Sequence, residues 1–143
     1  MSSFAPHFMA GLITGGAVAG ISYAFTEQPT ALSTTLPFVA GVIGALAPDM
    51  DIKSKSSQIL YCFFASVATY FFFTGKTELA FLILLYSIFP QFFAHRGFIH
   101  SLIFAILSTA ALYACLIYLL HWPALFAAIA YFFGFLTHKA LDE

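Results

Sequence analysis

Charged residues are scarce in this chain: Asp, Glu, Lys and Arg make up only 8% of its 143 residues, whereas 62% are hydrophobic. Soluble domains are about half apolar, and a soluble fold of this length needs more polar surface than so few charges supply. The composition therefore excludes a water-soluble globular protein and predicts one that lies in a lipid bilayer. Because no linker, internal repeat or low-complexity stretch divides the chain, we expect residues 1–143 to form a single transmembrane domain.

Basic residues and cysteines are also few. Five Lys and Arg residues with a net charge of −1 cannot form the basic stripe that nucleic acid requires, so no nucleic-acid partner is expected. No Lys or Arg precedes Lys53, so the basic region of a cleavable signal peptide is missing and the first apolar segment is expected to remain as a span. Cys62 and Cys115 lie in separate apolar segments and are expected to pack as small apolar side chains, not as a disulfide.

The sequence contains six apolar segments, separated by short polar or proline-containing breaks. A straight transmembrane helix needs about 20 apolar residues. The first, third and fifth segments meet this length, and the other three are predicted to be short or broken spans that borrow polar flanks or stop at a pocket. The predicted fold class is therefore all-α, a polytopic membrane protein with about six transmembrane helices. The segments are residues 7–25, 36–47, 58–74, 79–93, 98–120 and 123–137.

Two local patterns predict details of these helices. Gly11 and Gly15, and likewise Gly16 and Gly20, form Gly-x-x-x-Gly pairs in the first segment, a spacing that suits close contact with another membrane helix. Ser101 stands just before the fifth segment, where its hydroxyl is expected to cap the helix.

Potential metal ligands lie at the ends of the apolar segments. If every segment crosses the bilayer once, each odd-numbered segment starts, and each even-numbered one ends, on the same face. All seven candidate ligands then share one face, whereas His121 lies on the opposite face. The seven residues are His7, Asp49, Asp51, His95, His100, His138 and Asp142.

The distribution of basic residues predicts which face this is. The face with the candidate ligands also carries Lys53, Lys55, Arg96 and Lys139, and the other carries Lys76. Positive charge near the ends of spans favours the cytoplasm. We therefore expect the ligands and both termini on the cytoplasmic side.

Histidine and carboxylate ligands without a nearby cysteine are typical of zinc sites, and also of manganese or iron. Because seven ligands exceed the four of one tetrahedral zinc, a centre of two ions about 3.5–4 Å apart would use them better than a single ion. Arg96 is then placed to bind a phosphate oxygen, and Asp51 either binds an ion or orients a ligand. The plain structural alternatives are a polar turn at Asp49 and Asp51, an interfacial turn around residues 95–100, and a solvated helix end after residue 137.

Three motifs resemble those of the YdjM-like inner-membrane metal-dependent hydrolases, bacterial proteins described as LexA-regulated. They are Pro48-Asp49-Met50-Asp51, His95-Arg96-Gly97-Phe98-Ile99-His100-Ser101 and His138-x-x-x-Asp142. The resemblance implies a multi-pass protein of the bacterial inner membrane, a divalent metal and hydrolase activity. It also implies a distant similarity to zinc-dependent phospholipase C and single-strand nucleases. The ligands it implies are His7, Asp49, His95, His100, His138 and Asp142.

The reaction expected from these residues is metal-dependent hydrolysis of a phosphoester, with Arg96 and Asp51 as catalytic residues. A site at the membrane surface without a soluble domain favours a lipid or isoprenoid-linked substrate that arrives through the bilayer. An intramembrane metalloprotease would need a His-Glu-x-x-His motif, which the sequence lacks. A metal or proton transporter would place its ligands near the midplane of the bilayer. A structural membrane protein would hold an ion without an open coordination position.

Overall fold

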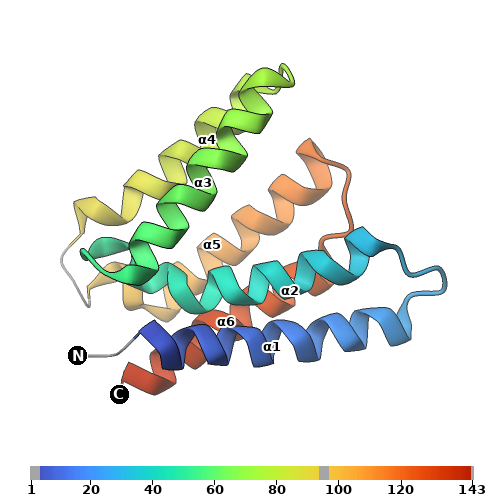
Figure 1. Cartoon of the computed structure of the whole chain (residues 1–143), viewed down its shortest axis with the longest axis horizontal. Coiled ribbons are helices and arrows are strands. Elements are labelled where there is room, and N and C mark those ends of the chain that lie inside the picture. Colours follow the sequence, from blue (N-terminus) through green and yellow to red (C-terminus); the bar gives the residue numbers. More distant parts are fainter. Residues whose placement is uncertain (1–3, 94–96, 143) are drawn as a thin grey trace.

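The computed structural model describes residues 4–93 and 97–142, which form helices and short connections with no β-strand among them. The predicted all-α fold class is confirmed. Each of the six apolar segments corresponds to one α-helix (Figure 1). The helices are α1 (Phe4–Phe25), α2 (Ala31–Leu46), α3 (Lys55–Phe73), α4 (Thr77–Ile88), α5 (Leu102–Ala114) and α6 (Leu125–Asp142).

Serine and threonine side chains fix where three helices begin. Thr30 and Ser33 form a capping box before α2, and Ser54 and Ser57 form another before α3. Ser101 accepts a hydrogen bond of 3.1 Å from the backbone N–H three residues later, which confirms the predicted cap of α5. Each side-chain oxygen pairs an N–H group that the first turn of a helix leaves without a partner.

Short turns of other helix types extend three of the helices. Proline has no N–H and clashes with the preceding turn, so the chain tightens into 3₁₀ turns at Pro48, after α2, and at Pro90, after α4. A third 3₁₀ turn precedes α5, and a π-helical turn follows it. The four turns are η1 (Ala47–Asp51), η2 (Phe89–Phe92), η3 (Phe98–His100) and η4 (Cys115–Leu119).

Four helices are long and apolar enough to cross a membrane: α1, α2 with η1, α3, and α5 with η4. The segment from Thr77 to Phe92 is apolar but shorter, as predicted, and α6 is not among the four. The second span borrows polar flanking residues, as predicted: the capping box at Thr30 lets α2 begin at Ala31, before the apolar segment, and η1 continues it to Asp51.

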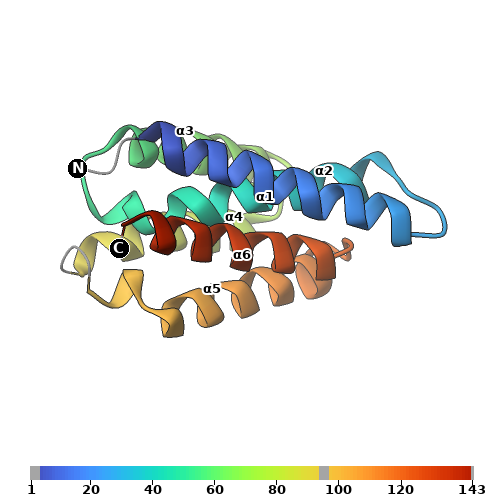
Figure 2. The ribbon, with the colours of Figure 1, turned by 90° about the horizontal axis from the view of Figure 1, so that it is seen from below.

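Glycine allows α1, α2 and α6 to pack with their backbones nearly in contact. A Cβ atom added at Gly15 would clash with the backbone of α2 at Phe38, and one added at Gly134 would clash with the carbonyl oxygen of Gly41. The predicted contact through Gly11 and Gly15 is thus confirmed. The pair at Gly16 and Gly20 is not used in this way, because a Cβ at either position would meet nothing within 4 Å. Each of the three helices packs against the other two (Figures 1 and 2).

Helices α3 and α4 form a hairpin that diverges from α1, α2 and α6 (Figure 1). The base of the hairpin lies beside η1, and its tip points away from the other helices. Both ends of the described chain lie at the end of the molecule that carries this base (Figure 1). The start of α1 and the ends of α2 and α6 therefore meet at one end of the molecule.

Candidate metal centre

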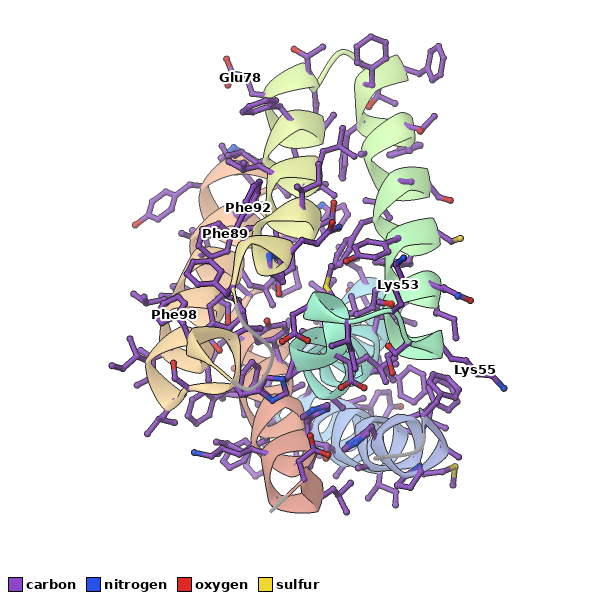
Figure 3. All side chains as sticks on the ribbon, turned by 90° about the vertical axis from the view of Figure 1, so that its left-hand side faces the viewer. Lys53, Lys55, Glu78, Phe89, Phe92 and Phe98 are labelled. Atoms are coloured by element: carbon purple, nitrogen blue, oxygen red, sulfur yellow. The ribbon has the colours of Figure 1, made fainter. Side chains whose placement is uncertain are left out.

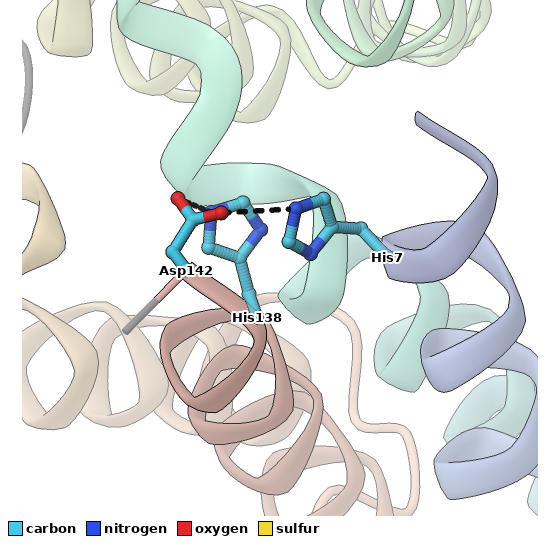
Figure 4. Close-up of side chains that lie close together, drawn as sticks. All are labelled: His7, His138 and Asp142. Atoms are coloured by element: carbon cyan, nitrogen blue, oxygen red, sulfur yellow. Dashed lines mark ion pairs between the residues drawn. The ribbon is translucent and has the colours of Figure 1, made fainter. Parts of the chain in front are cut away.

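Three helices each deliver a histidine or an aspartate to one buried point. His7 comes from the first turn of α1, Asp49 from η1 at the end of α2, and His138 and Asp142 from the last turns of α6. The side chains of His7, His138 and Asp142 face one another in Figure 4. His7 and His138 are fully buried, and Asp49 is only 4% exposed. These four residues are called the His–Asp cluster below.

Within the cluster, the carboxylate of Asp142 bridges the two imidazoles, and that of Asp49 approaches His138. The Oδ1 atom of Asp142 lies 3.3 Å from Nε2 of His7, and its Oδ2 atom lies 3.5 Å from Nε2 of His138 (Figure 4). Oδ1 of Asp49 approaches the same Nε2 atom of His138 to 3.6 Å. The two imidazole rings stack with their centroids 4.0 Å apart. One potential ligand atom each from His7, His138 and Asp142 lies within 4.8 Å of the others, close enough to share one ion.

A hydrogen bond to the backbone determines which ring nitrogen of His138 is protonated. Nδ1 of His138 lies 2.8 Å from the carbonyl oxygen of Ala45. A carbonyl only accepts hydrogen bonds, so Nδ1 carries a proton, and when the ring is neutral its Nε2 presents a lone pair to both carboxylates. Neither this Nε2 nor Oδ1 of Asp49 has a hydrogen-bond partner in the described part of the chain. Buried acceptors that face one another repel unless a proton or a cation lies between them.

Asp49 is held in place by residues that the sequence analysis did not single out. The hydroxyl of Ser56, itself fully buried, donates a hydrogen bond of 3.0 Å to Oδ2 of Asp49. This bond leaves Oδ1 to face His138. The sequence does contain a pattern from which Ser56 could have been predicted, because several serines follow the Asp-x-Asp motif directly at the start of the third helix. Serines in such positions cap helices and orient nearby carboxylates.

A second chain of hydrogen bonds fixes the position of η1. The hydroxyl of Tyr61 in α3 donates to the carbonyl oxygen of Met50 at 2.5 Å, and Nε2 of Gln91 in η2 donates to the same hydroxyl at 3.1 Å. Both contacts span long stretches of sequence, so they tie the turn that carries Asp49 to the base of the α3–α4 hairpin.

Asp51 and His100 form a pair beside the His–Asp cluster. Oδ2 of Asp51 lies 3.7 Å from Nε2 of His100, and the His100 ring centroid lies 5.5 Å from that of His138. The Asp51 side chain is fully buried and that of His100 is 11% exposed, so this pair is buried to a similar extent as the cluster, in which the Asp142 side chain is 10% exposed. Six of the seven candidate ligands therefore gather at one end of the molecule. His95 and Arg96 lie outside the described residues.

Basic residues surround this end of the molecule. Lys53 is exposed on the connection between η1 and α3, Lys55 is exposed at the first position of α3, and both lie at the end that faces the viewer in Figure 3. Glu78, at the tip of the hairpin, lies far from them in the same view. Exposed positive charge therefore lies at the same end of the molecule as the cluster.

The helices and the cluster define an all-α membrane protein with buried histidine and aspartate side chains at one end of its helix bundle. The chain matches the YdjM inner membrane protein family over residues 1–143, and it belongs to that family. No curated protein and no solved structure gives a significant match. Membership confirms the resemblance of the motifs and assigns the chain to a membrane. The distant similarity to phospholipase C and to single-strand nucleases stays a prediction.

Proposed function

We propose that the protein is a membrane-embedded, metal-dependent hydrolase whose divalent ion is held by His7, Asp49, His138 and Asp142. The observation that carries this proposal is the buried set of acceptor atoms around Nε2 of His138, which faces two carboxylates at 3.5 and 3.6 Å. A cation would convert this repulsion into attraction. Two imidazole nitrogens and two carboxylates suit zinc best, with manganese and iron as further candidates.

The reaction proposed is cleavage of a phosphoester. A divalent ion supplies Lewis acidity and lowers the pKa of bound water to near neutrality. Asp51 and His100, beside the cluster, either hold a second ion or move a proton at the reacting water. Lys53 and Lys55 attract the phosphate to this end of the molecule. As in the sequence analysis, Arg96 is proposed to bind the phosphate group and His95 to bind a metal ion.

The substrate proposed is a phosphate-bearing lipid, because the chain is an inner membrane protein and its cluster lies at the ends of apolar helices. Basic residues at this end favour a cytoplasmic location for the site and both termini. A green fluorescent protein fused after residue 143 should therefore fluoresce. If only a periplasmic reporter is active there, the orientation is reversed.

A structural ion is the second candidate, because four protein ligands would fill the coordination of a tetrahedral zinc. The pair of Asp51 and His100 favours the hydrolase, since it offers further groups outside those four. A transporter is disfavoured because the cluster lies at helix ends and not at the midplane.

Elemental analysis of detergent-purified protein tests the proposal. The wild type should contain one or two equivalents of zinc, and a His7→Ala/His138→Ala variant should contain none. His121→Ala is the matched control, because His121 lies in the connection between α5 and α6 at the other end of the helices, and it should retain the metal. Metal-free wild type, even after incubation with zinc or manganese, would refute the proposal. If the protein binds metal but releases phosphate from no phospholipid or isoprenyl phosphate, the hydrolase proposal is wrong and a structural ion is the remaining candidate.

A further inference from the structure

The backbone carbonyl of Met50 lies between the two aspartates of η1. Oδ1 of Asp49, the residue before Met50, lies 3.6 Å from Nε2 of His138, and Oδ2 of Asp51, the residue after it, lies 3.7 Å from Nε2 of His100. Met50 is buried, and the last turn of a helix leaves its carbonyl groups without a partner inside that helix. A buried carbonyl without a hydrogen bond is costly, so the group that bonds to this carbonyl also holds the peptide between the two aspartates.

The hydroxyl of Tyr61 in α3 is that group. It donates to the carbonyl oxygen of Met50 at 2.5 Å and accepts a hydrogen bond of 3.1 Å from Nε2 of Gln91. A phenolic hydroxyl has one proton to donate, and the hydrogen bond from Gln91 leaves this proton for Met50. The Tyr61 ring also packs against a buried apolar cluster that includes Leu46 and Met50, which restricts its movement.

Tyr61 holds η1 in a different way from Ser56. The hydroxyl of Ser56 bonds to Oδ2 of Asp49, so it orients the side chain of one aspartate. The hydroxyl of Tyr61 instead bonds to the backbone between Asp49 and Asp51, so it acts on the orientation of both. Because Tyr61 donates its proton to a backbone carbonyl, it acts through the aspartates and is not itself a metal ligand.

Gln91 connects this arrangement to a second turn. It lies in η2, which packs beside η1. Along the chain, η2 leads to His95 and Arg96, the predicted ligand and phosphate-binding residue. The hydrogen bonds from Gln91 through Tyr61 to Met50 therefore link the turn that carries two aspartates to the turn that precedes the His-Arg motif. A displacement of η2 would act on the aspartates of η1 through this link.

We propose that Tyr61 is a positioning residue of the metal centre. Through the carbonyl of Met50 it directs Asp49 and Asp51 toward their histidines, and through Gln91 it makes the affinity for the ion depend on the position of η2. This assignment rests on the proposed metal-dependent function and names a control on its ion-binding site.

The affinity of the folded, detergent-purified protein for zinc, measured by competition with a chelator, tests the proposal. Tyr61→Phe keeps the ring and removes only the hydroxyl, so zinc binding should weaken by about 10- to 100-fold. A residue with a purely structural role would lower the unfolding midpoint in EDTA and leave the zinc affinity of the folded protein unchanged. Tyr70→Phe is the control, because Tyr70 also lies in α3 but is exposed and lies further from η1 along the helix.

Gln91→Leu tests the link to η2. It should weaken zinc binding by about three- to tenfold, the net contribution of one hydrogen bond. The double variant Tyr61→Phe/Gln91→Leu should bind zinc as Tyr61→Phe alone does, because Gln91 then has no hydroxyl to which it can donate. Gln58→Leu is the control, since Gln58 is also exposed and lies in α3. Losses that multiply in the double variant would overturn the link.

The remaining outcomes separate this assignment from the proposed function. Wild-type zinc affinity in Tyr61→Phe would overturn the positioning role and leave the metal-dependent function intact. If Tyr61→Phe does not fold in EDTA, Gln91→Leu decides, and wild-type affinity in that variant would overturn the assignment. A wild-type protein that binds neither zinc nor manganese refutes the metal-dependent function, and the positioning role is then wrong as well.

Discussion

At the scale of single residues, one hydrogen bond sets the chemistry of the His–Asp cluster. Because Nδ1 of His138 bonds to the carbonyl oxygen of Ala45 at 2.8 Å, the ring presents Nε2 to Asp49 and Asp142. The carbonyl belongs to α2, so the histidine of one helix takes its tautomer from the backbone of another. Backbone carbonyls orient many metal-binding histidines in this way.

Ser56→Ala tests the part of this arrangement that orients Asp49. Loss of the hydroxyl removes the 3.0 Å hydrogen bond to Oδ2 and leaves Asp49 free to turn away from His138. Zinc affinity, measured by competition with a chelator, should fall by about 10- to 100-fold. Ser66→Ala is the control, because Ser66 also lies in α3 and bonds only to the carbonyl oxygen of Cys62. Equal affinities in the two variants would show that Ser56 has no part in positioning Asp49.

At the scale of the elements, glycine contacts set the distance between the helices that carry the ligands. Gly44 packs against the carbonyl oxygen of Tyr131, and Gly134 packs against that of Gly41. These contacts bring α2 and α6 close enough for Ala45 to reach His138. A bulkier residue at such a crossing would separate the ligands even though it touches none of them.

Gly15 and Gly16 offer an adjacent pair for testing this packing. Gly15→Ala introduces a Cβ atom against the backbone of Phe38, and overpacking of this kind costs about 1–3 kcal/mol. Gly16→Ala introduces a Cβ atom into open space and removes a helix-interior glycine, so it should stabilise by up to about 1 kcal/mol. Thermal unfolding in detergent should show a lower midpoint temperature for the first variant and an equal or higher one for the second. The opposite order would contradict the close packing of α1 on α2.

Some features of these elements follow from the sequence and others do not. His7, Asp49, His138 and Asp142 are predicted to share one face of the membrane because an even number of bilayer crossings separates the ends at which they lie. This argument does not depend on how the helices pack. The apolar pattern alone does not fix the start of α2 at Ala31, because the capping box at Thr30 extends the helix through the polar residues before the apolar segment. The pairing of Asp51 with His100, and the role of Ser56, depend on how the turns between the helices pack, which apolar periodicity does not encode.

At the scale of the whole molecule, the cluster joins the first helix to the last. His7 of α1 and Asp142 of α6 lie 3.3 Å apart at their nearest atoms, although four helices separate them in the sequence. The α3–α4 hairpin diverges from the remaining helices and leaves an apolar groove between them (Figure 1). Composition predicts apolar helices but not this divergence, because lipid-facing and groove-lining residues are equally apolar.

An ion shared by α1, α2 and α6 should stabilise the molecule as a whole. A ligand present at 100 times its Kd stabilises the folded state by about 2.7 kcal/mol. Addition of EDTA to the zinc-loaded wild type should therefore lower the midpoint temperature of unfolding. The midpoint of the His7→Ala/His138→Ala variant should not respond to EDTA, whereas that of His121→Ala should respond like the wild type. An unchanged wild-type midpoint would contradict an ion held between these helices.

The order in which the chain is made gives the cluster a further property. The ribosome delivers His7 with the first helix and His138 and Asp142 with the last, so the cluster is incomplete until α6 has been inserted. Until then, Asp49 and His7 have no partner on α6. If the protein is the hydrolase proposed above, the nascent chain is therefore inert toward the lipids around it until α6 has been inserted.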